Sequence, residues 1–92
     1  MIQLVLNSPF LSQDLEQVLR YRQDADLLVL MQDAVVAVTA PQWCERLNGI
    51  PLYVMGEDLK ARGLSPRIGM ELDMAGLIKL IAEHGSPQTW AG

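Results

Sequence analysis

The sequence has one cysteine and one histidine, which excludes several kinds of site at the outset. A lone cysteine, Cys44, can form neither an internal disulfide nor a cysteine-based zinc cage, and this usage is typical of proteins from a reducing compartment. A lone histidine, His84, excludes a metal site or an acid–base pair built from two histidines. We therefore expect no metal and no bound cofactor.

Basic residues are also few, because seven Lys and Arg stand against eleven Asp and Glu and give a net charge of −4. Without a run of Lys or Arg, the chain lacks the cation density needed to grip a phosphate backbone, so direct binding of nucleic acid is disfavoured. The longest apolar runs, such as residues 27–31, are too short to cross a membrane. The first residues show no basic segment or cleavage site of a secretory signal. We expect a cytoplasmic protein without membrane contact.

Glycine-rich loops are missing too, and Asn7-Ser8-Pro9 stands where a nucleotide-binding loop would follow the first apolar run. No repeat, low-complexity tract or linker divides the chain, so residues 1–92 are expected to form a single domain. Half of the residues are hydrophobic, which is a high apolar content for one domain of this size. Some apolar surface is therefore expected to remain outside the core.

Short apolar runs alternate with amphipathic segments, and this pattern predicts strands that alternate with helices. The expected strands are residues 2–6, 27–31, 51–55 and 70–72. The first expected helix is residues 9–22, with Ser8 as its cap and a buried stripe of Leu11, Leu15, Val18 and Leu19. The second is residues 34–38, with Asp33 as its cap. The remaining expected helices are residues 41–47, residues 57–62 and a last helix between Asp73 and Gly85. The valines of residues 34–38 leave a continuing strand as the alternative.

Alternating strands and helices predict a parallel sheet with right-handed crossovers and helices on both faces. The expected fold class is α/β, a small three-layer sandwich that is flavodoxin-like in the loose sense.

Cys44 is the only candidate for thiol chemistry in the sequence. A reactive thiolate needs a nearby cation or a helix N-terminus, which Arg46 and Pro41 offer in part, but Glu45 is adjacent. A lone cysteine beside Trp43 on a short helix is more often a small packed hydrophobic residue. We therefore expect no catalytic residue, with Cys44 kept as the alternative.

Trp90 lies in the tail after Pro87, which ends any continuation of the last helix. The tail is expected to run extended, either away from the helix or back across a sheet edge. A large ring is not expected to stay in water, so Trp90 either packs on its own domain or anchors a partner. Trp90 is the candidate residue for a partner interface.

Six segments carry a resemblance to a known family, in one order and spacing. They are LVLNSPF (4–10), Gln32-Asp33, Tyr53-Val54, DLKARG (58–63), the helix after Asp73 and Gln88-Thr89-Trp90. Together they resemble the DsrH/TusB family of sulfur-relay subunits over essentially the whole chain, with DLKARG and the terminal Trp as the most specific parts.

The resemblance implies a DsrE/F/H-like fold and, as in the TusBCD complex, assembly with TusC-like and TusD-like subunits into a dimer of heterotrimers. It also implies a role in 2-thiolation of the tRNA wobble uridine, where TusD-type subunits carry the persulfide cysteine and pass sulfur to TusE.

One departure from the family pattern bears on mechanism. DsrH proteins of sulfur oxidisers carry a cysteine in the first helix where this sequence has Val18, and TusB-type members can lack it. Cys44 matches no motif position, so the resemblance implies a TusB-type, non-catalytic subunit of a sulfurtransferase complex. Two alternatives remain open: a sulfurtransferase that accepts persulfide on Cys44, and a self-associating DsrE-like module with a regulatory role.

Overall fold

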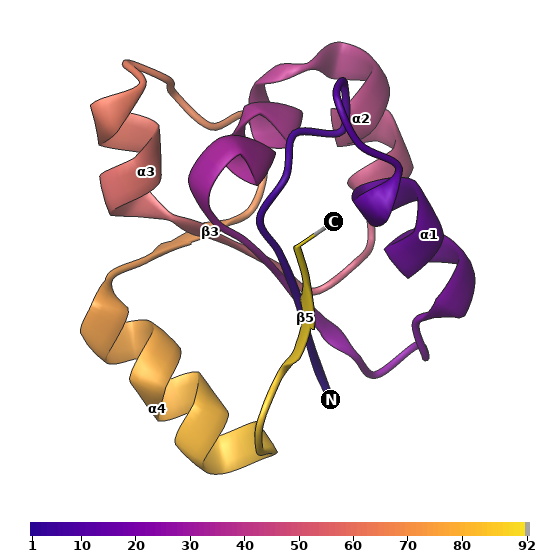
Figure 1. Cartoon of the computed structure of the whole chain (residues 1–92). Coiled ribbons are helices and arrows are strands. Elements are labelled where there is room, and N and C mark those ends of the chain that lie inside the picture. The colour runs from indigo at the N-terminus through magenta and orange to yellow at the C-terminus, as the bar shows by residue number, and fades with distance from the viewer. Residues whose placement is uncertain (92) are drawn as a thin grey trace.

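Five short strands form one sheet in the computed structural model of the chain, which describes residues 1–91 (Figure 1). They are β1 (Ile2–Val5), β2 (Leu27–Leu30), β3 (Leu52–Met55), β4 (Met70–Leu72) and β5 (Gln88–Trp90). The helices are α1 (Asp14–Tyr21), the 3-10 helix η1 (Gln32–Thr39), α2 (Pro41–Leu47), α3 (Gly56–Ala61) and α4 (Met74–His84). Within residues 1–91, no helix is long and apolar enough to cross a membrane.

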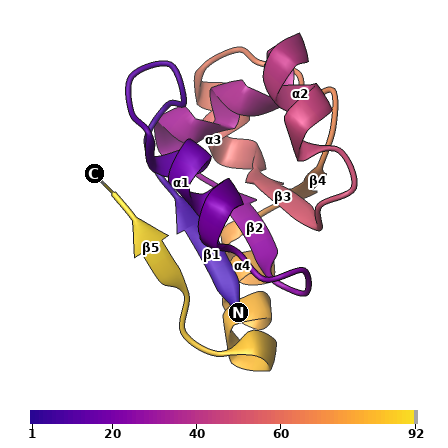
Figure 2. The same ribbon diagram turned by 90° about the vertical axis from the view of Figure 1, so that its right-hand side faces the viewer.

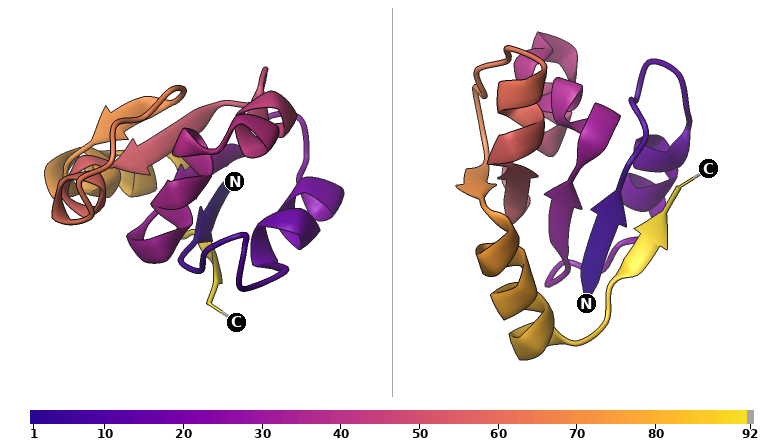
Figure 3. Two further views of the ribbon diagram at one scale, coloured as in Figure 1. Left: turned by 90° about the horizontal axis from the view of Figure 1, so that it is seen from above. Right: turned by 60° about the vertical axis from the view of Figure 1, so that its left-hand side comes forward.

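The layers of the fold follow from the order in which the strands are joined. All neighbouring strands are parallel, in the order β4-β3-β2-β1-β5, so the last connection runs back across the sheet to reach the far side of β1. When a right-handed crossover runs back along the sheet, its helix lies on the face opposite to that of the preceding crossovers. Accordingly α4 alone covers one face and the other helices cover the second (Figures 1 and 3), which confirms the three-layer α/β sandwich.

Most of the core lies between the sheet and the layer that contains α1, η1, α2 and α3. Its fully buried side chains include Val5, Leu15, Val18, Leu28, Leu30, Val35, Val38 and Val54. Burying each of them stabilises the fold by roughly 1.5–3 kcal/mol relative to exposure. The opposite face has a smaller core in which Leu77 of α4 packs over Ile2, Leu4 and Val29.

Several local predictions are confirmed. Residues 32–39 are helical and do not continue the strand, and α2 begins at Pro41 as expected. Gly63 ends α3 with φ of 65°, a left-handed conformation that glycine adopts without steric cost. The carboxylate of Asp73 accepts a hydrogen bond from the N–H of Gly76 at 2.7 Å and caps α4.

The expected helix over residues 9–22 is wrong in its first part, because α1 begins at Asp14. Ser8 does not cap this helix. Its carbonyl oxygen accepts hydrogen bonds from the N–H groups of Leu11 and Ser12 at 3.1 and 3.0 Å, which closes a separate turn. Leu11, expected in the buried stripe, is instead 88% exposed, because this turn points it away from the core.

The tail runs back along the sheet edge, which is the second of the two expected courses. Residues 88–90 pair in parallel with β1, from Gln3 opposite Gln88 to Val5 opposite Trp90. The N–H of Leu6 also donates to the carbonyl oxygen of Trp90 at 3.2 Å. Figure 2 shows β5 as one edge of the sheet, next to β1 and far from β4.

Candidate partner interface

Trp90 is fixed to its own chain by a hydrogen bond and by packing. Its indole Nε1 donates to Oε1 of Gln3 at 2.8 Å, and the ring packs, partly buried, against the main core. Side chains two residues apart in a strand lie on the same face, so Gln3 and Val5 share a face of the sheet. Trp90 is the residue paired with Val5 and covers this face, which brings Gln3 within reach of the ring. The structure thus places Trp90 over its own domain, and its contact with a partner stays a prediction.

Tyr21, the last residue of α1, stacks on Trp90. The two ring centroids lie 6.4 Å apart and the ring planes differ by 16°. Such offset stacking is a favourable arrangement for aromatic side chains. Tyr21 is 72% exposed, so solvent reaches the pair at the β5 edge of the sheet. We call Tyr21 and Trp90 the aromatic edge.

Asp26, which precedes β2, holds the other end of Gln3. Oδ2 of Asp26 accepts hydrogen bonds from the N–H of Gln23 at 2.9 Å and from Nε2 of Gln3 at 3.1 Å. The pKa of Asp26 lies below its ordinary value, although burial acts in the opposite direction. The hydrogen bond from Gln23 is the largest cause of this lowering, and the hydrogen bond from Gln3 adds to it. The ionised carboxylate thereby orients Gln3, and Gln3 orients Trp90.

Cys44 lies on α2 and is half-buried. Its S–H donates to the carbonyl oxygen of Val38, with Sγ 3.3 Å from that oxygen. Arg46, the cation nearest to it in sequence, lies over the ring of Trp43 at 4.6 Å from the centroid and forms an ion pair with Glu16. The thiol is therefore held by backbone groups of η1, and the neighbouring cation is engaged elsewhere.

Charged side chains join η1 to α3 beyond the carboxyl end of β2. Nη2 of Arg62 lies 2.8 Å from Oδ1 of Asp33, and Nη1 of Arg62 lies 3.6 Å from Oδ1 of Asp58. The N–H of Gln32 donates to Oδ2 of Asp58 at 2.8 Å, and Gln32 has a left-handed φ of 51°. The prediction that Asp33 caps a helix is wrong, because its carboxylate pairs with Arg62. Two residues of the DLKARG motif thus have a structural role.

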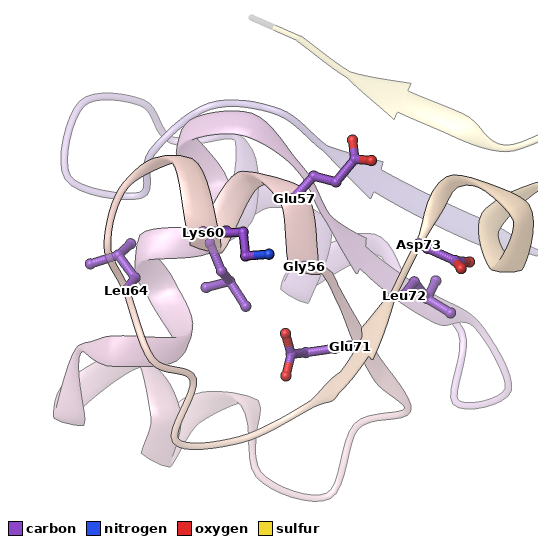
Figure 4. Close-up of a pocket in the computed structure, with 8 residues that line it drawn as sticks. Gly56, Glu57, Lys60, Leu64, Glu71, Leu72 and Asp73 are labelled. Carbon is purple, nitrogen blue, oxygen red and sulfur yellow. The ribbon is translucent and has the colours of Figure 1, made fainter.

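An acidic cavity of 610 Å³ lies between α3 and β4. Figure 4 shows Lys60 and Glu71 pointing into it, with Glu57 and Asp73 at its border. Across residues 1–91, no three His, Cys, Asp or Glu side chains are grouped closely enough to hold a metal ion. The cavity therefore offers charge but no metal-ligating cluster.

The class of this protein follows from its fold and from its exposed side chains. The chain is a small α/β protein with an all-parallel sheet, one backbone-bonded thiol, and an exposed histidine at the end of α4. Its large exposed hydrophobic side chains are Met1, Phe10, Leu11, Tyr21, Met70, Met74 and Ile78. Apolar surface therefore remains outside the two cores, as the composition predicts.

Comparison with known proteins identifies the family. Residues 7–86 match the family model described as DsrH like protein. Protein TusB of Escherichia coli O81 (strain ED1a) is 34% identical over 96 residues, which cover 98% of this chain and 100% of that protein. Protein TusB of Enterobacter sp. (strain 638) is 33% identical with the same coverage. The chain belongs to the DsrH/TusB family, as its motifs predicted.

Proposed function

We propose that this chain is a subunit of a cytoplasmic sulfur-relay complex needed for 2-thiolation of the tRNA wobble uridine. The observation that carries the proposal is the 34% identity with TusB proteins over 98% of the chain. The partners are TusC-like and TusD-like subunits, in a dimer of heterotrimers, as the family resemblance implies. Residues 1–92 act in this assembly as a single domain.

The proposed role is to support the assembly and not to carry sulfur. The position that holds a cysteine in DsrH proteins of sulfur oxidisers is Val18, whose side chain lies in the core with no exposed surface. A valine cannot form a persulfide. Cys44, the remaining thiol, is half-buried and hydrogen-bonded to η1. We infer that this subunit completes a surface that positions the reactive cysteine of a partner.

The aromatic edge is the proposed contact for one of these partners. Trp and Tyr are enriched at the centres of protein interfaces, and here the ring of Trp90 is held by its hydrogen bond to Gln3, with Tyr21 stacked on it. Tyr21→Ala tests the contact more cleanly than a change at Trp90, because Tyr21 is 72% exposed and is not needed for the core. The variant is expected to melt near the wild-type temperature and to bind its partner roughly tenfold more weakly. Unchanged binding would remove the aromatic edge from the interface.

Co-expression with the TusC-like and TusD-like chains of the same organism, followed by size-exclusion chromatography, tests the assembly. Co-elution of all three chains is the expected result, and a self-associated chain without them would favour the regulatory module. Intact mass spectrometry tests the remaining alternative. A gain of about 32 Da on Cys44, one sulfur atom, would favour the sulfurtransferase.

A further inference from the structure

The loop between β1 and α1 is built as a rigid projection. Figures 2 and 3 show it rising beyond the carboxyl end of the sheet. Buried Ser8 organises the turn: its Oγ accepts from the N–H of Phe10 at 3.2 Å and its carbonyl oxygen from the next two N–H groups. At the base of the loop, Nδ2 of Asn7 donates to Oδ2 of buried Asp14 at 3.0 Å. Pro9 fixes one further backbone angle.

This rigid loop presents two large hydrophobic side chains to solvent. Phe10 is 54% exposed and Leu11 is 88% exposed, the largest exposed fraction among the large hydrophobic residues described. Neither belongs to a core cluster. A flexible loop would lose conformational entropy on binding, whereas this one is already ordered by its hydrogen bonds. Phe10 and Leu11 are called the apolar knob below.

Polar and negatively charged groups border the apolar knob. A hollow of 380 Å³ is lined by Leu11 and Asp33, together with Asn7, Ser8 and Ser12. Asp33 and Asp58 share the single cation Arg62, which leaves this cluster with a charge of −1 (two negative, one positive). An apolar centre with a polar rim is the usual anatomy of a protein interface. The rim here favours a partner with a Lys or Arg at the matching position.

A second copy of this chain does not fit the apolar knob well. An apolar groove of 500 Å³ exists in the chain, lined among others by Ile50, Pro51, Ile68 and Met70. These residues lie at or before the amino ends of β3 and β4, whereas the apolar knob follows the carboxyl end of β1. Because the sheet is all parallel, knob and groove lie at opposite ends of the molecule. The lining of this groove also contains no Lys or Arg that could meet the negatively charged rim of the knob.

We propose that the apolar knob anchors this chain in an apolar pocket of a different protein subunit, one with a basic side chain at the rim of the pocket. The inference rests on the proposed function, because the partner is a subunit of the same relay complex. It adds to that function a second contact, at the carboxyl end of the sheet and separate from the aromatic edge. The knob is a hot spot within a wider interface, since two side chains alone bury too little surface for a stable complex.

The test compares two matched double variants of the full chain. Phe10→Ser with Leu11→Ser removes the apolar knob, and Met74→Ser with Ile78→Ser removes two side chains of α4 that are 46% and 61% exposed on the opposite face. All four side chains are about half exposed or more and none belongs to the buried core, so the two variants are expected to lose similar amounts of stability and to melt close to each other. Leu11→Ser alone serves as a second knob variant that disturbs the turn least.

Binding to the co-expressed TusC-like and TusD-like chains is then measured by titration. The knob variant is expected to bind roughly 100-fold more weakly, Leu11→Ser about tenfold more weakly, and the α4 variant within about threefold of the wild type. If the wild-type chain assembles and the knob variant binds equally well, the inferred role of the apolar knob is wrong and the proposed function stands. Failure of the wild-type chain to assemble would overturn the proposed function as well. Self-association of the isolated chain that is lost in the knob variant would identify a second copy as the occupant and contradict the inference.

Discussion

Replacing Trp90 with Ala should destabilise the isolated chain by an amount that the structure allows us to work out. A fully buried Trp costs about 3–5 kcal/mol when truncated to Ala, and the partly buried ring of Trp90 should cost about 2 kcal/mol. Gln3 is 7% exposed and would lose the donor to its Oε1, which adds about 1 kcal/mol. The sum of about 3 kcal/mol corresponds to a melting temperature lowered by about 12–24 °C in a domain of this size.

Thermal unfolding of Trp90→Ala and Trp90→Phe, followed by circular dichroism, measures the effect. Trp90→Phe keeps a ring against the core and stacked on Tyr21 but removes the N–H donor, so it should cost only about 1 kcal/mol. Hydrogen exchange should show the largest loss of protection in β5 and at its partner Leu6, because an edge strand opens first. A melting temperature of Trp90→Ala within about 3 °C of the wild type would refute the packing of this ring on its own domain.

Two further predictions concern the acid response of the fold and the absence of an RNA-binding surface. The lowered pKa of Asp26 means that its carboxylate stabilises the fold above about pH 4 and that this contribution is lost as the pH falls through the lower folded-state pKa. Asp26→Asn should therefore lower the urea midpoint at pH 7 and flatten its decline below pH 4, and equal acid slopes in both proteins would contradict this. With a net charge of −4, the isolated chain should not bind tRNA at physiological salt in a filter-binding titration, and micromolar, salt-sensitive binding would contradict this.

The fold could be predicted largely because its local signals agree with one another. Buried strands are apolar on both faces in a parallel sheet, so β2 stands out as a continuous apolar run. Asp73 and Gly63 carry the chemistry that a helix start and a helix end require, and both act as expected. Signals of this kind are local and need no knowledge of distant contacts.

The start of α1 could not be predicted because two structures compete for the same residues. Ser8 followed by Pro9 fits the start of a helix, yet the same serine also closes a turn through its side chain and carbonyl oxygen. The bond from Asn7 to Asp14 spans the loop and favours the turn. The exposure of Leu11 follows from that choice and carries no signal of its own in the sequence.

The candidate interface was predicted only in part. Trp90 stood out as a large ring in a tail, but β5 has just three residues, two of them polar, and its pairing with β1 is set by contacts distant in sequence. Gln3 reads as one polar residue inside an apolar run, and only the folded chain brings it against Trp90. The role of Arg62 likewise depends on Asp33, which lies 29 residues away.

The central claim is that this chain supports a sulfur relay to tRNA without carrying the sulfur itself. Mass spectrometry of nucleosides from total tRNA, in a strain lacking the gene for this chain, tests it most directly. The claim predicts that 2-thiouridine at the wobble position is lost and that wild type and Cys44→Ser restore it equally, because Ser keeps the hydrogen bond to η1 but cannot form a persulfide. Undiminished 2-thiouridine in the deletion strain would contradict the proposed function. Failure of a folded, assembled Cys44→Ser subunit to restore it would show that this chain carries sulfur.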